Sequence, residues 1–234
     1  MKIRFDSILF LISMCVITGC SHHTEQEKST LAETNDVTSV AEYGLEELRE
    51  KYPEWIDNEG NIQYPYNSDS KEHQNADSYQ ELCKLYDIPK EIVDHTETEK
   101  LLRAVEEYPL LDFSLYDTFK IATENYKNNF YAYMVLQSRS DANQAAWDSF
   151  QQKQENQMLN SQDELQQRAE INKIILDESL LLTKSGNKQF NDEEKKEILT
   201  QVKSLHNQIE DIGEKLGLRV YGLDEMVSDS SWEI

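Results

Sequence analysis

The regular spacing of apolar residues near the C-terminal end is the strongest pattern in this chain of 234 residues. Six aliphatic residues recur there at alternating intervals of four and three: Ile198, Val202, Leu205, Ile209, Ile212 and Leu216. Such an alternation places all six on one stripe of a helix, as in the a/d seam of a coiled coil. Asn191 and Glu194 have capping-box spacing, and Gly217 stands where helices commonly end. The pattern therefore predicts one long helix between Asn191 and Gly217.

A second helix is predicted directly before it, over Gln162–Thr183. Ser161 and Glu164 have the spacing of a capping box at its start. Its apolar stripe consists of Ile171, Ile174, Ile175, Leu181 and Leu182. Because only the short turn at 185–187 separates the two helices, we expect an antiparallel αα-hairpin. The heptad seam could instead face a partner chain, and the sequence leaves that alternative open.

Two shorter helices are predicted in the middle of the chain. The first follows a capping box formed by Thr96 and Glu99 and ends at Glu107. Its inward residues are Leu101, Leu102 and Val105. The second has Ser140 as its N-cap and carries an apolar stripe of Ala142, Ala145, Ala146, Trp147 and Phe150. The polar, amide-rich stretch 151–161 predicts either a solvated continuation or a break, and so a possible sub-boundary of the domain.

Between these two helices lies a longer predicted helix, Thr118–Gln137, which Asp117 or Ser114 would cap. Its inner stripe is largely aromatic and consists of Phe119, Ala122, Tyr126, Phe130, Tyr133 and Met134. An aromatic stripe could form a face that binds sugar or peptide. At spacings of three and four it is more typical of a hydrophobic core, which is the interpretation we favour.

The N-terminal part of the chain shows shorter patterns. A helix is predicted over Val40–Tyr52, ended by Pro53. Two short apolar segments flank the turn residues Asn58–Asn61, which suggests a small hairpin. A polar loop is expected over Asn67–Asn75.

A further helix over Ala76–Tyr86 places Cys83 on its apolar stripe, where a free cysteine is usually a small buried residue. Ile88–Val93 forms one more short turn of helix. The predicted fold is therefore mainly α. It is a helical bundle with a C-terminal antiparallel αα-hairpin and a small, irregular or hairpin-containing N-terminal part.

The first nineteen residues have the three parts of a secretory signal. Lys2 and Arg4 lie at the start, and an apolar run of about eleven residues follows over Ser7–Ile17. The small residues Thr18 and Gly19 close the segment. The run is too short to cross a bilayer, which takes about 20 residues. We therefore expect export rather than a membrane-spanning helix.

The end of this segment, Ile17-Thr18-Gly19-Cys20, resembles the lipobox of bacterial lipoproteins, although the family more often has Leu in place of Ile17. The resemblance implies a diacylglycerol thioether on Cys20, signal cleavage between Gly19 and Cys20, and a mature chain that begins at Cys20. Two acyl chains hold a protein to a membrane far more firmly than one. The expected location is therefore the extracytoplasmic face of the cell membrane.

The predicted organisation has four parts: a signal peptide over 1–19, a flexible tether over 20–39, a helical domain over 40–217 and an acidic tail over 218–234. The tether is polar and lacks aromatic residues, so it cannot bury enough apolar surface to order itself.

Charge restricts the partners of the mature chain. Removal of residues 1–19 takes two of 23 basic residues and one of 45 acidic residues, and so leaves 21 and 44, a formal net charge of −23. This charge disfavours nucleic acid and close contact with an anionic membrane surface. It favours a cationic protein or peptide partner. The same charge is also explained by solubility alone.

The cysteines exclude an intramolecular disulfide. Cys15 would leave with the signal peptide and Cys20 would carry lipid, so Cys83 is the one thiol that remains. A CxxC site is excluded for the same reason. Stability must therefore come from a hydrophobic core.

The sequence also lacks the motifs of common catalytic and metal sites. It contains no glycine-rich phosphate loop, GxSxG or HExxH. His95 with Glu99 and His206 with Glu210 each have i, i+4 spacing, but a zinc site takes at least three protein ligands. We therefore predict no catalytic, cofactor or metal residue, and a protein that is not an enzyme.

Residues 88–150 resemble a set of uncharacterised secreted proteins of Firmicutes. The residues that carry the resemblance are Ile88-Pro89, Thr96–Glu99 with Leu101-Leu102, Tyr108–Asp112, Tyr116 and Arg139–Ala142. These motifs are helix caps and turns, and the family has no assigned activity. The resemblance implies only a Gram-positive host and a recurring helical module.

These features together predict a lipid-anchored, extracytoplasmic interaction or binding protein of a Gram-positive-type bacterium. It would bind through an acidic face or a groove between helices. One alternative is an immunity or exclusion lipoprotein that intercepts a cationic peptide or a phage component. A transporter-associated solute-binding component is a second alternative, although the strand–helix alternation of two α/β lobes is missing. The third is a hydrolase, which would need a cluster of carboxylates with perturbed pKa values.

Overall fold

The computed structural model describes residues 44–155, 157–183 and 188–226, all of which lie in one compact unit. The predicted signal and tether, with Gly19 and Cys20, lie outside the described residues, as do the turn at 185–187 and residues 227–234 of the predicted tail. The described part is mainly helical and contains no strand. The predicted mainly α fold is therefore confirmed.

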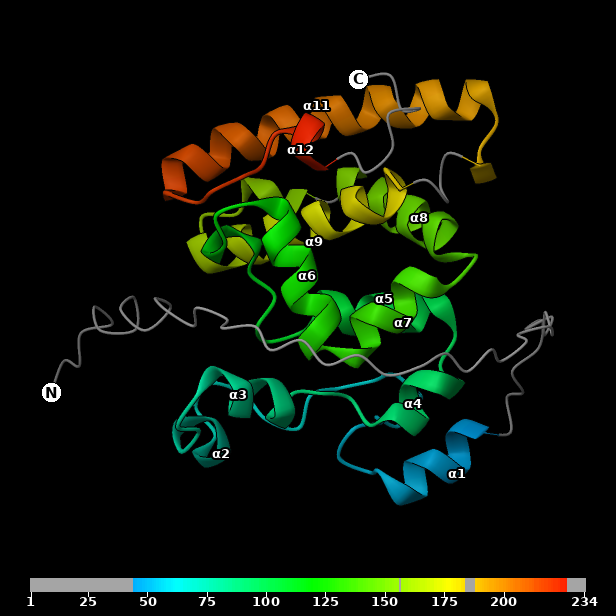
Figure 1. Cartoon of the computed structure of the whole chain (residues 1–234), viewed down its shortest axis with the longest axis vertical. Coiled ribbons are helices and arrows are strands. Elements are labelled where there is room, and N and C mark those ends of the chain that lie inside the picture. Colours follow the sequence, from blue (N-terminus) through cyan, green and yellow to red (C-terminus); the bar gives the residue numbers. More distant parts are fainter. Residues whose placement is uncertain (1–43, 156, 184–187, 227–234) are drawn as a thin grey trace, which may run out of the picture. The chain divides into compact units, whose positions relative to one another are not determined.

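The helices of the first half of the chain are short, and the three longest lie in the second half, before one more short helix (Figure 1). The first eight elements are α1 (Gly44–Lys51), α2 (Lys71–Gln74), α3 (Tyr79–Leu85), α4 (Lys90–His95), α5 (Thr98–Glu106), the 3-10 turn η1 (Phe113–Leu115), α6 (Phe119–Asn129) and α7 (Tyr131–Ser138). The later elements are α8 (Ala142–Glu155), the 3-10 turn η2 (Gln157–Asn160), α9 (Glu164–Leu181), α11 (Asp192–Leu216) and α12 (Leu223–Met226). Within the described ranges, none of the helices combines the length and the apolar character needed to span a membrane.

The predicted N-terminal hairpin is present in its shortest form. Ile56 and Ile62 form one isolated antiparallel bridge around a turn. Gly60 has a φ of 76°, which is costly for a residue with a Cβ. Asp57 stabilises the turn because its Oδ1 accepts a hydrogen bond of 2.8 Å from the backbone N–H of Asn61.

Two expectations for the following segment are wrong. The loop expected over 67–75 contains the short helix α2, because the hydroxyl of Ser70 accepts a hydrogen bond from the backbone N–H of His73 and caps it. In α3, Cys83 is buried as expected, but Tyr79 is 41% exposed although it belongs to the predicted stripe. The stripe of a short helix thus faces the core over only part of its length.

The predicted capping box at Thr96 is also wrong. The hydroxyl of Thr96 donates to the carbonyl of Ile92 at 2.6 Å, and so Thr96 belongs to the end of α4. Helix α5 begins at Thr98 without a side-chain cap. Arg139 instead donates to the carbonyls of Val93 at 2.9 Å and Thr96 at 2.5 Å. A side chain from a distant segment therefore secures the end of α4.

The predicted helix over Thr118–Gln137 is divided into α6 and α7. The chain leaves helical geometry at Phe130, with φ −136° and ψ 99°. Asp87 stabilises the new start because its Oδ1 accepts a hydrogen bond of 3.1 Å from the backbone N–H of Tyr131. The division changes the helical phase, and Met134 is 44% exposed instead of buried. The other five residues of the aromatic stripe are buried, as a core interpretation requires.

The N-caps of two helices lie close to the predicted residues but do not coincide with them. Thr118, rather than Asp117 or Ser114, caps α6. Asp163, rather than Ser161, caps α9 through hydrogen bonds from two backbone N–H groups. In both cases the residue directly before the first helical turn provides the cap.

The polar stretch 151–161 contains both a continuation and a break. Helix α8 continues through its first half to Glu155, and η2 occupies Gln157–Asn160. At the other end, α8 begins directly after Asp141, so Ser140 is not the residue that flanks it. Most of the apolar residues predicted for this helix are buried.

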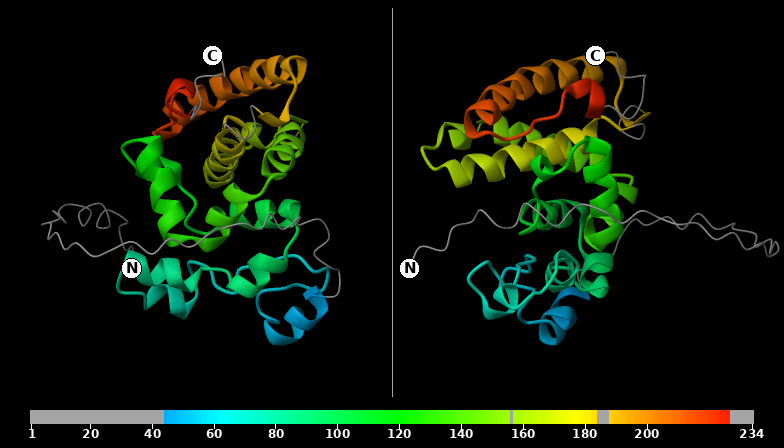
Figure 2. Two further views of the ribbon diagram at one scale, coloured as in Figure 1. Left: turned by 45° about the vertical axis from the view of Figure 1, so that its right-hand side comes forward. Right: turned by 60° about the vertical axis from the view of Figure 1, so that its left-hand side comes forward.

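Helices α9 and α11 form the predicted antiparallel αα-hairpin. Arg168 donates to the carbonyl of Leu216 at 2.6 Å, and Glu178 lies 2.7 Å from His206. The residue number rises along α9 while that of the partner falls along α11, which is the register of antiparallel helices. Figures 1 and 2 show α11 lying along α9 in every ribbon view.

The ends of α11 agree with the sequence pattern. Asn191 and Glu194 form a full capping box, and Gly217 ends the helix with a φ of 65°. The first four residues of the heptad seam are buried, and Ile212 and Leu216 are partly buried against the core. Within the described residues the seam therefore packs inside the chain.

Residues 218–226 pack on the helical body, so the expectation of a tail that starts at Leu218 does not hold for them. The hydroxyl of Tyr221 donates to the carbonyl of Phe113 at 2.5 Å. The carboxylate of Glu225 accepts a hydrogen bond of 2.8 Å from the backbone N–H of Phe119. These contacts join the last described helix, α12, to the start of α6.

Candidate functional site

A cavity of about 600 Å³ lies between α5, α8 and α9. Four acidic and three basic side chains line it, together with a smaller apolar part. Glu99 and Arg103 stand four residues apart on α5, and Glu170 and Lys173 stand three apart on α9, which places each pair on one helix face. A cavity of this size matches pockets that bind small molecules or short peptide segments, typically about 300–1,000 Å³.

Lys153 is the best-buried basic residue of the lining, with 7% of its surface exposed. Its ammonium nitrogen lies 2.6 Å from Glu106 Oε1, 2.5 Å from Asp177 Oδ2 and 2.5 Å from Ser149 Oγ. An ammonium group has three N–H donors. Each donor therefore has an acceptor inside the protein.

The carboxylates keep Lys153 protonated. Burial alone would lower the pKa of the Lys153 ammonium, but the charges and hydrogen bonds of Asp177 and Glu106 outweigh burial and raise it. Burial raises the pKa of Asp177 well above its usual range, and the charge of Glu106 adds to the effect. The cluster thus contains two carboxyl groups, those of Asp177 and Glu106, for the one ammonium group of Lys153. Their hydrogen bonds hold this ammonium group in place.

Glu170 is the buried carboxylate of the lining that has no partner, whereas Glu99 is exposed to solvent. Its residue surface is only 8% exposed, and it accepts no hydrogen bond and forms no ion pair within the described residues. Burial raises its pKa, although the charges of Lys153 and Lys173 act in the opposite direction. Buried carboxylates are normally paired. An unpaired one beside a cavity is a candidate for ligand contact.

Ser149 and Lys153 stand four residues apart on α8 and are hydrogen-bonded, which resembles the geometry of a serine nucleophile with a lysine base. A base must be able to accept the serine proton. Lys153 is protonated, and the hydroxyl of Ser149 donates to Glu106 at 2.8 Å. This arrangement stabilises a cluster and does not activate the hydroxyl.

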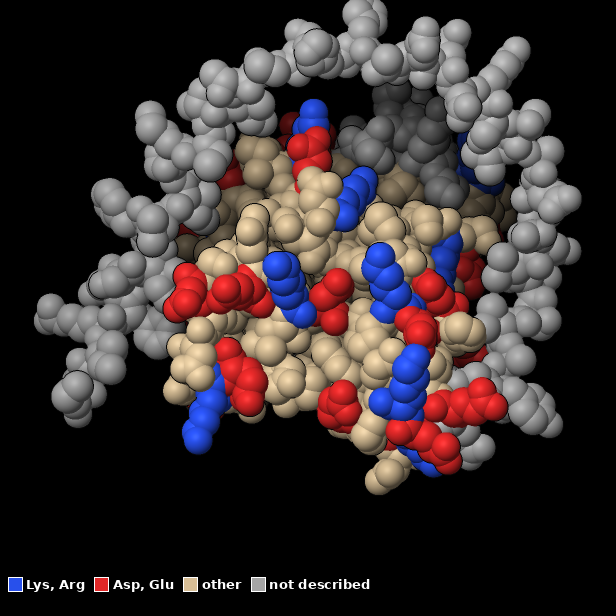
Figure 3. All heavy atoms as spheres, turned by 60° about the horizontal axis from the view of Figure 1, so that its bottom comes forward, with Lys and Arg blue, Asp and Glu red and all other residues tan. Residues whose placement is uncertain are grey.

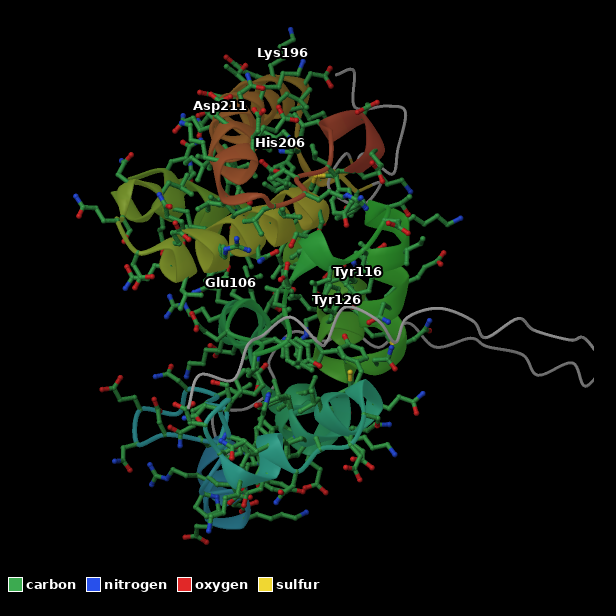
Figure 4. The ribbon with its side chains drawn as sticks, turned by 90° about the vertical axis from the view of Figure 1, so that its left-hand side faces the viewer. Glu106, Tyr116, Tyr126, Lys196, His206 and Asp211 are labelled. Atoms are coloured by element: carbon green, nitrogen blue, oxygen red, sulfur yellow. The ribbon has the colours of Figure 1, made fainter. Side chains whose placement is uncertain are left out.

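A second pair of buried charged side chains joins α9 to α11. Glu178 Oε2 lies 2.7 Å from His206 Nδ1, and both residues are almost fully buried. Figure 4 shows His206 directed from α11 toward α9, while Lys196 and Asp211 lie on the outer side of α11. Neither residue lines the cavity between α5, α8 and α9, and the pair joins the two helices of the hairpin.

The histidine pairs predicted from spacing have different outcomes. His206 Nε2 lies 3.6 Å from Glu210 Oε1, so this pair is near contact. His95 is not brought to Glu99, because its Nδ1 contacts the carbonyl of Glu91 at 2.8 Å at the end of α4. No group of three metal-ligating side chains is found in the described part of the chain.

Cys83 lies beside a polar cluster formed by the hydroxyls of Tyr79 and Tyr116 and the side-chain amide of Asn125. The hydroxyls of Tyr79 and Tyr116 are 3.1 Å apart, and the Tyr116 hydroxyl donates to Asn125 Oδ1 at 2.9 Å. Cys83 is buried, and burial raises the pKa of its thiol. It is therefore a packing residue and not a reactive thiol.

Sequence reasoning missed all the side chains that make this pocket chemically distinctive. Asp177 and Glu178 do interrupt a run of apolar residues in α9, and this is a usable signal of buried charge. Glu170, Lys153 and Glu106 have no such signal, because each lies in a polar stretch of sequence. Their burial follows from the packing of α5 and α8 on α9.

The described surface does not collect its negative charge in one area on the face that Figure 3 shows. Lys and Arg side chains alternate there with Asp and Glu side chains, with uncharged surface between them (Figure 3). On this face, selection of a charged ligand would depend on individual sites and not on a broad acidic surface.

No family model, curated protein or solved structure matches this chain. The lipobox and the likeness to secreted Firmicutes proteins therefore remain predictions from the sequence. The chemistry of the pocket has to be derived from its own side chains.

Proposed function

We propose that this chain is a lipid-anchored, extracytoplasmic binding protein of a Gram-positive-type bacterium that holds its ligand in the cavity between α5, α8 and α9. The observation that carries the proposal is Glu170, a buried carboxylate without a partner at the cavity. In the neighbouring charge cluster, all three ammonium donors of Lys153 have acceptors, which fixes this side of the cavity.

Binding suits this pocket better than hydrolysis does. Ser149 faces a protonated lysine and a carboxylate that accepts its hydrogen bond, so nothing withdraws its proton. Burial raises the pKa of both Glu170 and Asp177, but Asp177 is ion-paired with Lys153 and does not line the cavity, so it is not placed to act on a ligand as the second carboxylate of a hydrolase. The hydrolase therefore has less support than a binding protein.

The anchor is the part of the proposal that the sequence supports. The lipobox-like residues Ile17–Cys20 follow an apolar run that is too short to span a bilayer. Lipid attachment at Cys20 would hold the helical domain outside the cell, with residues 20–39 as the spacer.

Metabolic labelling with an alkyne fatty acid tests the anchor. Native protein and the Cys15→Ala variant should be labelled and should sediment with membranes, whereas Cys20→Ala should be unlabelled. Cys15 is a matched control because it is a cysteine of the same segment outside the lipobox. Equal labelling of Cys20→Ala would refute lipidation at this residue.

Capture of ligand from intact host cells tests the pocket. Cross-linked native protein is compared with Glu170→Gln and with Glu214→Gln. Glu214 is an exposed carboxylate on α11 whose side chain has no hydrogen bond or ion pair within the described residues. A ligand of the pocket should be recovered with native protein and Glu214→Gln and lost with Glu170→Gln. Equal recovery of the ligand with all three proteins would mean that it binds outside this cavity.

A second candidate is an immunity or exclusion lipoprotein, and the net charge of −23 after signal removal favours it through attraction of cationic peptides. Deletion of the gene should then make host cells more sensitive to cationic antimicrobial peptides. Sensitivity that does not change on deletion would contradict this role without affecting the binding pocket.

A further inference from the structure

We infer that the cavity between α5, α8 and α9 accepts a ligand with an ammonium or guanidinium group, such as a lysine or arginine side chain of a peptide, and that Glu170 pairs with this group. The inference rests on the proposed binding function and specifies its ligand class. The hydrogen-bonding state of the charged lining residues supports it.

Two of the three basic residues of the lining are already paired, whereas Arg103 is exposed and its side chain has no partner among the described residues. All three donors of Lys153 are already directed at Glu106, Asp177 and Ser149. Lys173 is ion-paired with Glu107. An anionic ligand at Lys153 or Lys173 would have to displace these partners, and each displacement would leave a carboxylate without its cation. An anion at Arg103 would form an exposed ion pair, which contributes little to binding.

Glu170, in contrast to Lys153 and Lys173, has no hydrogen-bond or ion-pair partner within the described residues. A carboxylate offers acceptor positions on two oxygens, and no described side chain or backbone N–H fills them here. A ligand that brings N–H donors and a positive charge would therefore gain new hydrogen bonds without breaking existing ones. Charge-assisted bonds of this kind are about twice as strong as neutral ones.

The lining as a whole carries an excess of negative charge, which also favours a cationic ligand. Four acidic residues face three basic ones, and Asp177 lies behind Lys153 as a further acid. A cation that enters the cavity therefore neutralises an excess of negative charge. An anion would increase that excess.

The remaining lining suits a long cationic side chain. Leu102 and Ala145 supply apolar surface, which an alkyl stem can cover while its charged end stays with a carboxylate. Gln151 and Gln152 are exposed at the lining, where their amides can bond to a peptide backbone. The cavity volume of about 600 Å³ is sufficient for a side chain together with a short peptide segment.

Burial without a hydrogen-bond partner makes Glu170 costly for folding, since the carboxylate loses part of its hydration and the nearby charges of Lys153 and Lys173 offset this cost only in part. A residue that serves only the fold would be expected to have a partner. Groups with this cost are concentrated at functional sites.

Calorimetric titration of the full-length lipidated protein in non-ionic detergent micelles tests the inference. The probes are three capped tripeptides, acetyl-Ala-X-Ala-amide, in which X is lysine, norleucine or glutamate. Norleucine keeps the alkyl stem of lysine and lacks the ammonium group. The lysine peptide should bind about tenfold or more tightly than the norleucine peptide, in line with one charge-assisted hydrogen bond. Its affinity should fall as salt rises.

The Glu170→Gln variant should lose this preference, so that lysine and norleucine peptides bind equally, while Glu214→Gln should keep it. Glu170→Asp retains the negative charge and should keep a reduced preference for the lysine peptide over the norleucine peptide. This result would show that the loss in Glu170→Gln comes from the missing charge and not from a folding defect. Cooperative thermal unfolding of each variant confirms that it is folded.

Equal or tighter binding of the norleucine or glutamate peptide would overturn the cationic inference and would still leave a binding pocket. Absence of binding by all three peptides would also overturn it. The capture experiment from intact cells then decides separately whether the proposed function stands.

Discussion

The ammonium nitrogen of Lys153 lies 2.5 Å from Oδ2 of Asp177, and this ion pair is almost completely buried. Lys153→Met should destabilise the protein by about 3–5 kcal/mol, because it leaves Asp177 charged and buried without a cation. Urea denaturation measures the effect.

Two further variants make this prediction specific. Replacement of Lys196, an exposed lysine on α11, by Met should change stability by less than about 0.5 kcal/mol. The double variant Lys153→Met/Asp177→Leu should regain at least about 1 kcal/mol relative to Lys153→Met, because no unpaired charge remains at position 177. A double variant that is less stable than Lys153→Met would show that the unpaired carboxylate of Asp177 is not the cause of the lost stability.

The buried pair of Glu178 and His206 should make stability depend on pH. Burial alone would lower the pKa of His206, but the hydrogen bond and charge of Glu178, with the charge of Glu210, raise it above its ordinary value of 6.5. The folded state therefore binds the imidazole proton more strongly than the unfolded state does. This stabilisation is fully present below pH 6.5 and is lost as pH rises through the pKa of the folded state.

Burial also raises the pKa of Glu178 above 4.5, so that its ionisation likewise lowers stability as pH rises. The melting temperature should therefore fall as pH rises above the ordinary histidine pKa of 6.5, and His206→Gln should flatten this slope. His95→Gln is the matched control, since His95 is exposed at the end of α4. If His206→Gln and native protein show parallel curves, the pair is not the source of the slope.

Arg139 should contribute strongly to stability although it lies between two helices and not within one. Its guanidinium donates to the carbonyls of Val93 and Thr96, and these hydrogen bonds carry a full charge. Arg139→Ala should cost about 2–3 kcal/mol, measured by thermal or urea unfolding. Arg139→Lys should recover less than half of that, because one ammonium group does not reproduce two bonds in fixed geometry. Full recovery by lysine would mean that charge alone is needed.

Glu170→Gln should stabilise the protein while it removes ligand binding. Burial raises the pKa of Glu170 above its ordinary value of 4.5, so the ionised carboxylate lowers stability at neutral pH. Its replacement should raise stability there by on the order of 1 kcal/mol. The difference should disappear as pH falls below 4.5, where the carboxyl is neutral in both states.

Glu214→Gln, which changes an exposed carboxylate on α11, should leave stability unchanged in the same series. If Glu170→Gln proved less stable than the native protein at neutral pH, Glu170 would have a structural role and the functional argument would lose its main support.

The parts of the fold that sequence analysis predicted well depend on contacts between near neighbours. The capping box of Asn191 and Glu194, the αL glycine at Gly217 and the heptad seam each involve residues within a few positions of one another. The antiparallel hairpin followed because a second apolar helix lay only a short turn away. Local periodicity and capping chemistry are sufficient for these features.

The features that sequence analysis predicted wrongly depend on distant partners. Thr96 had every local feature of an N-cap, but Arg139 binds its carbonyl from 43 positions away. The apolar stripe through Phe130 had helical spacing. However, Asp87, 44 positions away, accepts a hydrogen bond from the backbone N–H of Tyr131 and so stabilises the start of a new helix. Such contacts leave no periodic trace in the sequence.

The sequence by itself determined the helical class, the C-terminal hairpin and the large excess of acidic residues, because periodicity, caps and composition are local or additive properties. Only the tertiary structure decided which charges are buried, which of them are paired, and that Glu170 is left without a partner at a cavity. Burial and pairing depend on how α5, α8 and α9 pack together. Segments as far apart as Glu106 and Asp177 meet at one ammonium group, and no local pattern specifies that meeting.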